Sequence, residues 1–379
     1  MITRKIGQID LMIDITKSSS IYTNRDVAKL IEDANGSLDK IKDVIYESVG
    51  GYIPLAMTWE LTNNCNFNCP FCYIHNADEN SMIRFRTVKN DIDYLIEKGL
   101  FICYLSGGEA LSHPDFFDIY RFLKERGVLV AILTNCSLLN DDHIQLFSEY
   151  PPYKVVVSLY GISNSQFFSA TAQKTVTPDR ILDNVIKLKN AGIKVRCQSP
   201  MNQLTFTEFE EIAEWCELNN ISYSASDELL ESYSNKSNQE YVIDNEIFQL
   251  KKKGIHRVGI VKNDEVDTPS DKIMHKRHFD CKAGKHSLIL SYNHKLRPCF
   301  VLYGDTYPEF DANNSMVEAL EQMKTYIQEQ QSLIIEYCYG CYASSVCTEC
   351  SYTQSKASDL KSYMESKCAQ NRETVVQNG

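Results

Sequence analysis

The chain has 379 residues and a net charge of −11, from 39 Lys and Arg against 50 Asp and Glu. This length is enough for two or three domains and a large buried core. The acidic balance disfavours contact with a phosphate backbone, and no basic run interleaved with aromatic residues offsets it, so we expect no nucleic-acid partner.

The N-terminal segment lacks the apolar stretch of a signal peptide, and no window of the chain approaches 18 apolar residues. We therefore expect a soluble, uncleaved, cytoplasmic protein with no membrane partner. The cytosol keeps thiols reduced, so the 14 cysteines are not expected to form disulfides. Clustered thiols in such a protein indicate metal.

Residues 1–52 form a separate N-terminal element in this interpretation. The pattern predicts one strand followed by two short helices, with Gly36 ending the first helix and Ser37 capping the second. One structural role for the element is a cap that packs on the domain that follows.

Residues 53–230 alternate between apolar runs and helical patterns with polar faces. The runs lie at 57–62, 102–107, 128–135, 154–160, 193–199 and 221–226. Six buried strands alternating with helices predict a parallel sheet with helices outside it, either open or closed into a full or partial barrel. Functional residues are then expected just after the carboxyl ends of the strands.

Three cysteines directly follow the first predicted strand: Cys65, Cys69 and Cys72, spaced C-x3-C-x2-C. A structural zinc site needs four ligands and this stretch supplies three, so a zinc site would require a distant ligand such as His75. The second strand is followed by Gly107, Gly108 and Glu109. Four other cysteines lie singly in apolar segments and are expected to be buried as small apolar side chains: Cys103, Cys136, Cys197 and Cys216.

The rest of the chain divides into a polar connection at 231–275 and a cysteine-rich region at 276–379. The last region has one clear helical pattern, at 314–331. It contains seven cysteines: Cys281, Cys299, Cys338, Cys341, Cys347, Cys350 and Cys368. The two C-x2-C pairs within 338–350 also have the spacing of a four-cysteine zinc ribbon, which is the alternative to an iron–sulfur site.

The cysteine triplet, followed by "LSGGEALSHPDF" and then by the seven-cysteine tail, resembles the radical S-adenosylmethionine (SAM) superfamily and its SPASM branch. The resemblance implies a partial (β/α)6 barrel at 53–230 and a C-terminal iron–sulfur domain at 276–379. Residues 1–52 resemble part of the winged-helix element that binds leader peptides, although they are short for it.

The resemblance also implies the cofactors. Three thiolates hold three irons of a 4Fe–4S cluster, and the fourth iron is left for SAM. Glu109 would offer a carboxylate to the methionine ammonium, and the two glycines would allow close approach of the backbone to the ligand. Further SAM contacts carried over from the family are Asn135, Ser158 and Gln198, each of which is equally readable as an ordinary polar residue at a strand end. Cys136 replaces a glycine of relatives after Asn135.

The tail implies two auxiliary 4Fe–4S clusters, for three clusters in all. The nearer one would take Cys281, Cys299 and Cys350, and the farther one Cys338, Cys341, Cys347 and Cys368. The nearer cluster lacks a fourth cysteine, so His275, His278 or Asp280 fills the position or the iron stays open. His294 occupies a position where the pattern expects glycine, which predicts an unusual conformation at Asn293 or His294.

Two classes of function follow from the resemblance. One is a peptide maturase that captures a precursor peptide by its leader, abstracts hydrogen and installs a cross-link, with a thioether as first choice and C–C or C–O bonds next, or epimerises a residue. The other is a radical enzyme on another target, such as a sulfatase-maturing dehydrogenase or an enzyme of small-molecule or cofactor synthesis. Either would need an electron donor such as flavodoxin or ferredoxin. A non-catalytic metal protein is a distant third reading.

Overall fold

The computed structural model describes residues 2–6, 9–13, 21–23, 54–74, 81–226, 237–243, 283–300 and 308–338, with residues 52, 229, 230, 232 and 302. The chain divides into two compact units. The first comprises residues 1–262 and 290–294, and the second comprises residues 263–289 and 295–379.

Six parallel strands form the centre of the first unit, in the order β4-β5-β6-β7-β8-β9. They are β4 (Ala56–Glu60), β5 (Ile102–Ser106), β6 (Leu129–Thr134), β7 (Lys154–Ser158), β8 (Val195–Pro200) and β9 (Ser222–Ser226). β4 to β7 are buried over most of their length. Strands covered on both faces have continuous apolar runs, which explains why the sequence predicted β4 to β7. The predicted bounds of all six strands agree with the structure to within two residues at each end.

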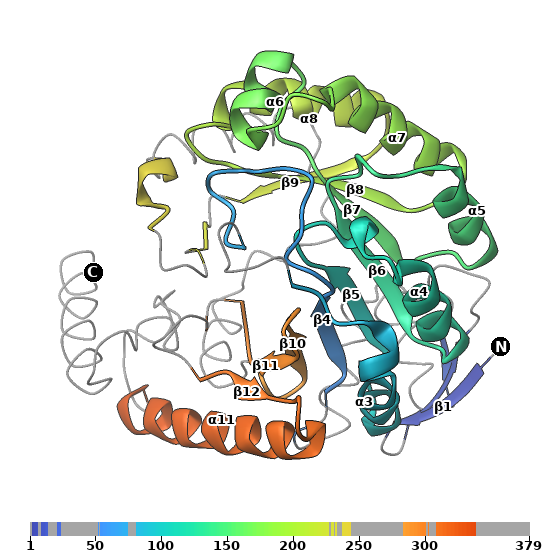
Figure 1. Cartoon of the computed structure of the whole chain (residues 1–379), viewed down its shortest axis with the longest axis vertical. Helices are drawn as coiled ribbons and strands as arrows, with labels where there is room; N and C mark the ends of the chain where they lie inside the picture. The colour runs from blue at the N-terminus through green and yellow to red at the C-terminus, as the bar shows by residue number, and fades with distance from the viewer. Residues whose placement is uncertain are drawn as a thin grey trace, which may run out of the picture. The chain divides into compact units, whose positions relative to one another are not determined.

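Helices connect the strands and lie along the outer side of this sheet (Figure 1). They are α3 (Phe85–Lys98), α4 (Phe116–Glu125), α5 (Asp141–Glu149), α6 (Asn164–Thr171), α7 (Pro178–Asn190) and α8 (Phe209–Leu218). Short 3-10 helices lie at η1 (Ala110–Ser112), η2 (Phe206–Glu208) and η3 (Gln239–Tyr241). Among the described helices, none has the length and apolar character needed to cross a membrane.

The amphipathic pattern of each helix decides its buried face. α3 buries Val88, Ile92 and Leu95, one residue per turn, and leaves its charged face exposed. α7 begins at Pro178, whose missing N–H needs no partner in the first turn, with Thr177 at the N-cap as predicted. Because every crossover returns through a helix, all six strands point the same way and their carboxyl ends share one edge of the sheet.

The N-terminal segment differs from the prediction. Three strands, β1 (Ile2–Ile6), β2 (Ile9–Ile13) and β3 (Ile21–Thr23), form an antiparallel sheet in the order β1-β2-β3, where the sequence predicted one strand. The strands have only three to five residues each, too few for a clear alternating pattern. The two predicted helices lie in residues 24–50, outside the described part.

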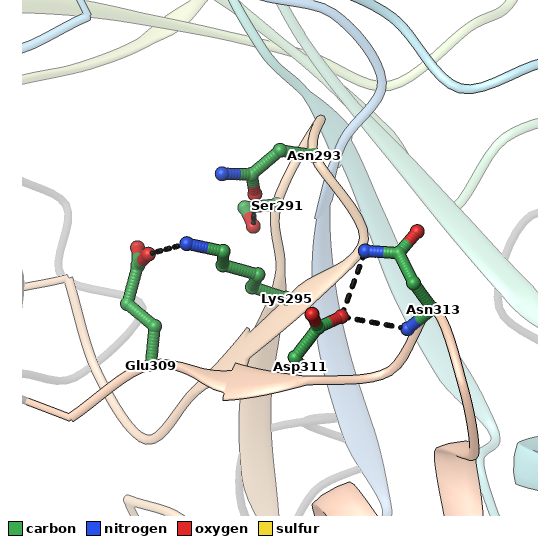
Figure 2. Close-up of polar contacts among 6 residues, drawn as sticks. All are labelled: Ser291, Asn293, Lys295, Glu309, Asp311 and Asn313. Atoms are coloured by element: carbon green, nitrogen blue, oxygen red, sulfur yellow. Dashed lines mark hydrogen bonds and ion pairs between the residues drawn. The ribbon is translucent and has the colours of Figure 1, made fainter.

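The second unit contains β11 (Lys295–Arg297), β12 (Phe310–Asp311) and α11 (Met316–Cys338), with β10 (Ser287–Leu290) neighbouring β11. Lys295 Nζ and Glu309 Oε2 pair at 2.9 Å beside the antiparallel β11–β12 ladder, and Asp311 Oδ1 accepts from the backbone and side-chain N–H groups of Asn313 (Figure 2). α11 packs on β11 and β12 through a buried stripe that includes Met316, Ala319, Met323 and Ile327. The helix confirms the pattern predicted at 314–331.

The turn between β10 and β11 confirms the unusual conformation that was predicted there. His294 has φ 61°, and its N–H donates to the carbonyl of Ser291 at 3.0 Å. Ser291 Oγ donates to Asn293 Oδ1 within the same turn (Figure 2). The buried imidazole of His294 lies 3.1 Å from Asp91 Oδ2 on α3, which gives the side chain a role that a glycine would lack.

Candidate functional site

Side chains at the carboxyl ends of the parallel strands line a cavity of about 710 Å³ in the first unit. Eight residues that were predicted from sequence line it: Cys65, Cys69, Cys72, Gly107, Gly108, Asn135, Ser158 and Gln198. The volume lies in the range of small-molecule and cofactor sites. The structure therefore brings together residues that span 134 positions of sequence, from 65 to 198.

The cysteine loop is held by hydrogen bonds and by the apolar residues between its thiols. The Asn68 N–H donates to the carbonyl of Thr171 at 2.9 Å, and Asn238 Nδ2 donates to the carbonyl of Phe71 at 3.0 Å. Phe67 packs edge-on against Phe167, with ring centroids 5.6 Å apart. The loop is thus positioned by a helix end and by a distant asparagine.

Cys65 and Cys69 differ in their surroundings. Cys65 opens to the cavity, and its Sγ accepts from the Phe67 N–H at 3.4 Å and from Asn135 Nδ2 at 3.7 Å. Withdrawal from bulk water still raises the pKa of Cys65 to about 12, with the Phe67 hydrogen bond opposing the shift. Burial also raises the pKa of Cys69. Both thiols therefore hold their protons at neutral pH until a metal displaces them.

The Gly-Gly-Glu turn after β5 packs against the start of the cysteine loop. The Gly108 N–H donates to the carbonyl of Thr62 at 2.7 Å, and the Glu109 N–H donates to the carbonyl of Asn64 at 2.9 Å. A Cβ on Gly107 would lie 2.4 Å from the Thr62 carbonyl oxygen, and one on Gly108 would lie 2.4 Å from that of Asn64. The close approach that the glycines allow here is between two backbone segments, which fixes the loop against β5.

Glu109 does not line the cavity. Its carboxylate is fully buried and accepts three hydrogen bonds, from Thr134 Oγ1 at 2.6 Å, the Asn135 N–H at 2.7 Å and the Leu111 N–H at 2.9 Å. Burial raises the pKa of Glu109, and these donors oppose the rise. In this geometry the side chain joins the ends of β5 and β6, whereas the sequence interpretation had it facing the methionine of SAM.

Asn135 lies at the centre of a polar network beside Cys65. Its Nδ2 donates to Asn66 Oδ1 at 3.0 Å, and its Oδ1 accepts from the N–H and hydroxyl of Ser137. Asn66 Nδ2 in turn donates to Ser137 Oγ at 2.7 Å. Cys136, between Asn135 and Ser137, has φ 62°, in the left-handed region that favours glycine. Asn66 and Ser137 were not predicted as site residues.

A row of polar side chains crosses three neighbouring strands at the cavity wall. Ser158 on β7 pairs in register with Gln198 on β8, which pairs with Ser224 on β9. All three line the cavity. Ser224 was missed because its strand was read only as apolar, although the alternation in "SYSAS" puts serines on one face.

The auxiliary cysteines are not brought together in the described part. Cys299 is half-buried after β11, and Cys338 is the last residue of α11. The other five of the predicted set lie outside the described residues, as do His75, His275, His278 and Asp280. The four isolated cysteines, in contrast, are fully buried as predicted: Cys103, Cys136, Cys197 and Cys216.

Residues 59–216 match the family model of the radical SAM superfamily. This part of the chain is a radical SAM domain. The family implies a 4Fe–4S cluster and SAM. The residues present fit both, because three cysteines face one cavity of suitable size and polar strand ends line the rest of its wall. No three His, Cys, Asp or Glu side chains in the described ranges gather closely enough for a single metal ion. A cluster needs no such group, since each cysteine binds a different iron.

Among curated proteins, the chain is similar to AlbA of Bacillus subtilis strain 168, the antilisterial bacteriocin subtilosin biosynthesis protein. The two are 23% identical over 313 residues, which is 76% of this chain and 67% of AlbA. SkfB of the same strain, the sporulation killing factor maturation protein, is 24% identical over 173 residues, which is 45% of this chain and 41% of SkfB. The chain thus spans less than half of SkfB.

Two solved structures share the fold. SuiB of Streptococcus suis bound to S-adenosylmethionine has a TM-score of 0.63 at 16% identity, covering 90% of this chain and 82% of SuiB. The structure of anSMEcpe with bound AdoMet and the Kp18Cys peptide has a TM-score of 0.60 at 12% identity, covering 86% of this chain and 98% of that chain. At these identities the likeness shows the α/β radical SAM fold.

Proposed function

We propose that this chain is a peptide maturase, an enzyme that uses SAM radical chemistry on a ribosomally made precursor peptide and installs an intramolecular cross-link. The observation that carries the proposal is the cavity in which Cys65, Cys69 and Cys72 meet the polar ends of β5 to β9. Two similar proteins, AlbA and SkfB, are named for bacteriocin biosynthesis and for killing-factor maturation. SuiB, with the same fold, has been solved bound to its precursor peptide SuiA, with a TM-score of 0.56.

In this proposal, the three cysteines hold the cluster that binds SAM. When bound, the cluster and SAM would supply the radical chemistry that removes a hydrogen atom from the substrate. Ser158 and Gln198 provide polar contacts for SAM from the carboxyl ends of β7 and β8. Glu109 acts on the same site through Thr134 and Asn135, because its carboxylate is already bonded to both.

The remaining parts of the chain would serve the peptide and the electrons. The β1–β3 sheet belongs to a leader-recognition element at 1–52, where an extended leader could add a strand. Two auxiliary 4Fe–4S clusters in residues 276–379 would use the seven C-terminal cysteines, and flavodoxin or ferredoxin would supply electrons. A nearer auxiliary cluster with only three cysteine ligands would suit a substrate thiolate, which favours a thioether product.

Mass spectrometry of the product tests the function. The reconstituted enzyme is incubated with SAM, reductant and the precursor peptide encoded beside its gene. A loss of two hydrogens from the peptide would support cross-linking, and an unchanged mass with deuterium uptake would indicate an epimerase instead. Cross-linking that persists after every substrate cysteine is replaced would exclude the thioether. No change in any precursor peptide, with SAM cleavage intact, would contradict the peptide-modifying function.

A further inference from the structure

Arg196 gives the cavity wall a positive charge. It is the second residue of β8, and among the described residues that line the cavity it is the one Lys, Arg, Asp or Glu. The cavity lining includes Arg196 and Gln198, whereas Cys197 between them does not line the cavity and is fully buried, as the strand alternation requires. In a chain with net charge −11, a single cationic side chain in the cavity indicates that the cavity binds a negatively charged group.

This guanidinium has no partner within the part of the chain that the structure describes. Two exposed arginines elsewhere in the first unit form ion pairs: Arg84 with Asp115 at 2.6 Å and Arg126 with Asp93 at 2.6 Å. Arg196 is exposed to the cavity and makes neither an ion pair nor a hydrogen bond among the described ranges. Its five N–H donors are therefore free to bind a ligand that enters the cavity.

The position of Arg196 along β8 favours contact with the substrate rather than with SAM. Gln198 lies in the row with Ser158 and Ser224, at the edge where the cysteine loop begins. Arg196 pairs instead with Val156 and Ser222, two residues earlier along each strand. Two residues of strand correspond to about 6.6 Å, so the backbone of Arg196 lies deeper in the cavity, away from the cysteine loop.

We propose that Arg196 is a specificity residue that binds a carboxylate of the substrate: an Asp or Glu side chain of the peptide near the residue that is modified. The proposal rests on the peptide-modifying function above. The planar guanidinium accepts a carboxylate through two parallel N–H···O bonds, which fixes both position and orientation. Such a charge-assisted, two-bond pair is stronger than a hydrogen bond between neutral groups.

The test measures peptide selection and SAM binding in the same reconstituted enzyme. A displayed library of random peptides of about 12 residues is captured on SAM-loaded wild type and on three variants: Arg196→Lys, Arg196→Gln and Arg196→Glu. Arg121→Gln is the matched control, because Arg121 is exposed on α4 and does not line the cavity. Iron content and the thermal midpoint show that each variant is folded and loaded.

We expect wild type and Arg121→Gln to enrich peptides that contain Asp or Glu. In Arg196→Gln this enrichment should fall at least about tenfold, because the carboxylate loses its cationic partner and the two parallel hydrogen bonds. Arg196→Lys should keep part of the acidic enrichment, because the lysine ammonium retains the positive charge but lacks the two parallel N–H donors of the guanidinium. Arg196→Glu should instead enrich peptides that contain Lys and Arg. The affinity for SAM should change by less than about threefold in Arg196→Gln, since the residue contacts the peptide.

Three results would overturn the proposal. The same acidic enrichment in Arg196→Gln as in wild type would show that the residue does not select the peptide. An unchanged peptide profile with a SAM affinity at least tenfold weaker would place the guanidinium on the carboxylate of SAM. A wild-type enzyme that cleaves SAM but enriches no peptide sequence would contradict the peptide-modifying function itself and remove this proposal with it.

Discussion

At Cys65, the sulfur receives two N–H donors, from the backbone of Phe67 and from the side chain of Asn135. Hydrogen bonds to the sulfurs of an iron–sulfur cluster favour its more negative, reduced state and raise its potential. Asn135 is itself oriented by Asn66, Ser137 and the carboxylate of Glu109. The network thus connects Glu109 at the end of β5 to the first thiol of the triplet without direct contact between them.

Replacing Asn135 by Ala should lower the midpoint potential of the SAM-binding cluster. A charge-assisted hydrogen bond is lost, and a change on the order of 50 mV corresponds to about tenfold in the one-electron equilibrium. Redox titration followed by electron paramagnetic resonance measures it. Asn184→Ala is the control. Asn184 Nδ2 donates to the carbonyl of Cys136, the residue after Asn135, at 2.8 Å and not to a thiol. Equal shifts in both variants, or none in Asn135→Ala, would show that the network is structural.

Two residues show what sequence can say about strained turns. Cys136 and His294 each occupy a position where the resemblance leads us to expect glycine, and each adopts a positive φ, of 62° and 61°. For a side chain this conformation costs roughly 1–2 kcal/mol, so other contacts must offset it. Cys136 is fully buried and its N–H donates to Thr134 Oγ1 at 2.8 Å, whereas His294 is buried beside Asp91. The motif located both turns. The compensating contact of Cys136 is with Thr134, two residues earlier, whereas that of His294 is with Asp91, far away in sequence.

Among the elements, the Gly-Gly turn after β5 and the cysteine loop form one packed unit. The turn donates two backbone hydrogen bonds to residues 62 and 64, at a separation that leaves no room for a Cβ. The turn therefore fixes the position of residue 62, three residues before Cys65, where the cysteine loop begins.

Gly108→Ala should displace the cysteine loop. The new Cβ would lie 2.4 Å from the carbonyl oxygen of Asn64, a backbone atom that can move only with the loop. We expect a loss of stability of at least about 2 kcal/mol and a loss of SAM binding greater than tenfold. Thermal unfolding and equilibrium binding measure the two effects.

Gly192→Ala is the matched control for this variant. Gly192 follows α7 with φ 76° and has open space where a Cβ would stand, so its replacement strains the backbone without touching the site. It should cost stability and leave SAM affinity unchanged. Normal SAM binding by Gly108→Ala would contradict the account of the turn.

The sequence predicted those elements whose residue pattern reflects their burial. β4 to β7 are buried over most of their length, so apolar runs identified them, and the helices between them have amphipathic patterns. On β8 and β9, the sequence predicted one residue of the cavity wall, Gln198, and no other. "VRCQSP" and "SYSAS" alternate, with one face toward the cavity, but an apolar-run reading overlooks that polar face and so missed Arg196 and Ser224. Which face of a strand meets a cavity depends on the closure of the sheet, which no local pattern contains.

Across the whole chain, separate parts have separate tasks in the proposed function. The N-terminal sheet β1–β3 lies outside the six-stranded sheet that carries the cavity. If residues 1–52 bind a leader peptide, the affinity for the precursor depends on them and the chemistry of SAM does not.

Deletion of residues 1–52 should therefore weaken precursor binding by about 100-fold or more, as expected when a strand-addition site is removed, while uncoupled SAM cleavage stays within about threefold. Fluorescence anisotropy with labelled precursor and chromatography of 5′-deoxyadenosine measure the two quantities. An equal loss of both would show that the element is a structural cap on the radical SAM domain.

The most direct test of the central claim is the iron content and SAM cleavage of the anaerobically reconstituted protein with and without the cysteine triplet. Wild type should hold about 12 irons per chain, from three four-iron clusters. Replacement of Cys65, Cys69 and Cys72 together by Ala should remove about four irons and all 5′-deoxyadenosine formation. Cys216→Ala, at a buried cysteine on α8, should change neither quantity. One or two equivalents of zinc with little iron, or SAM cleavage that survives loss of the triplet, would contradict the account.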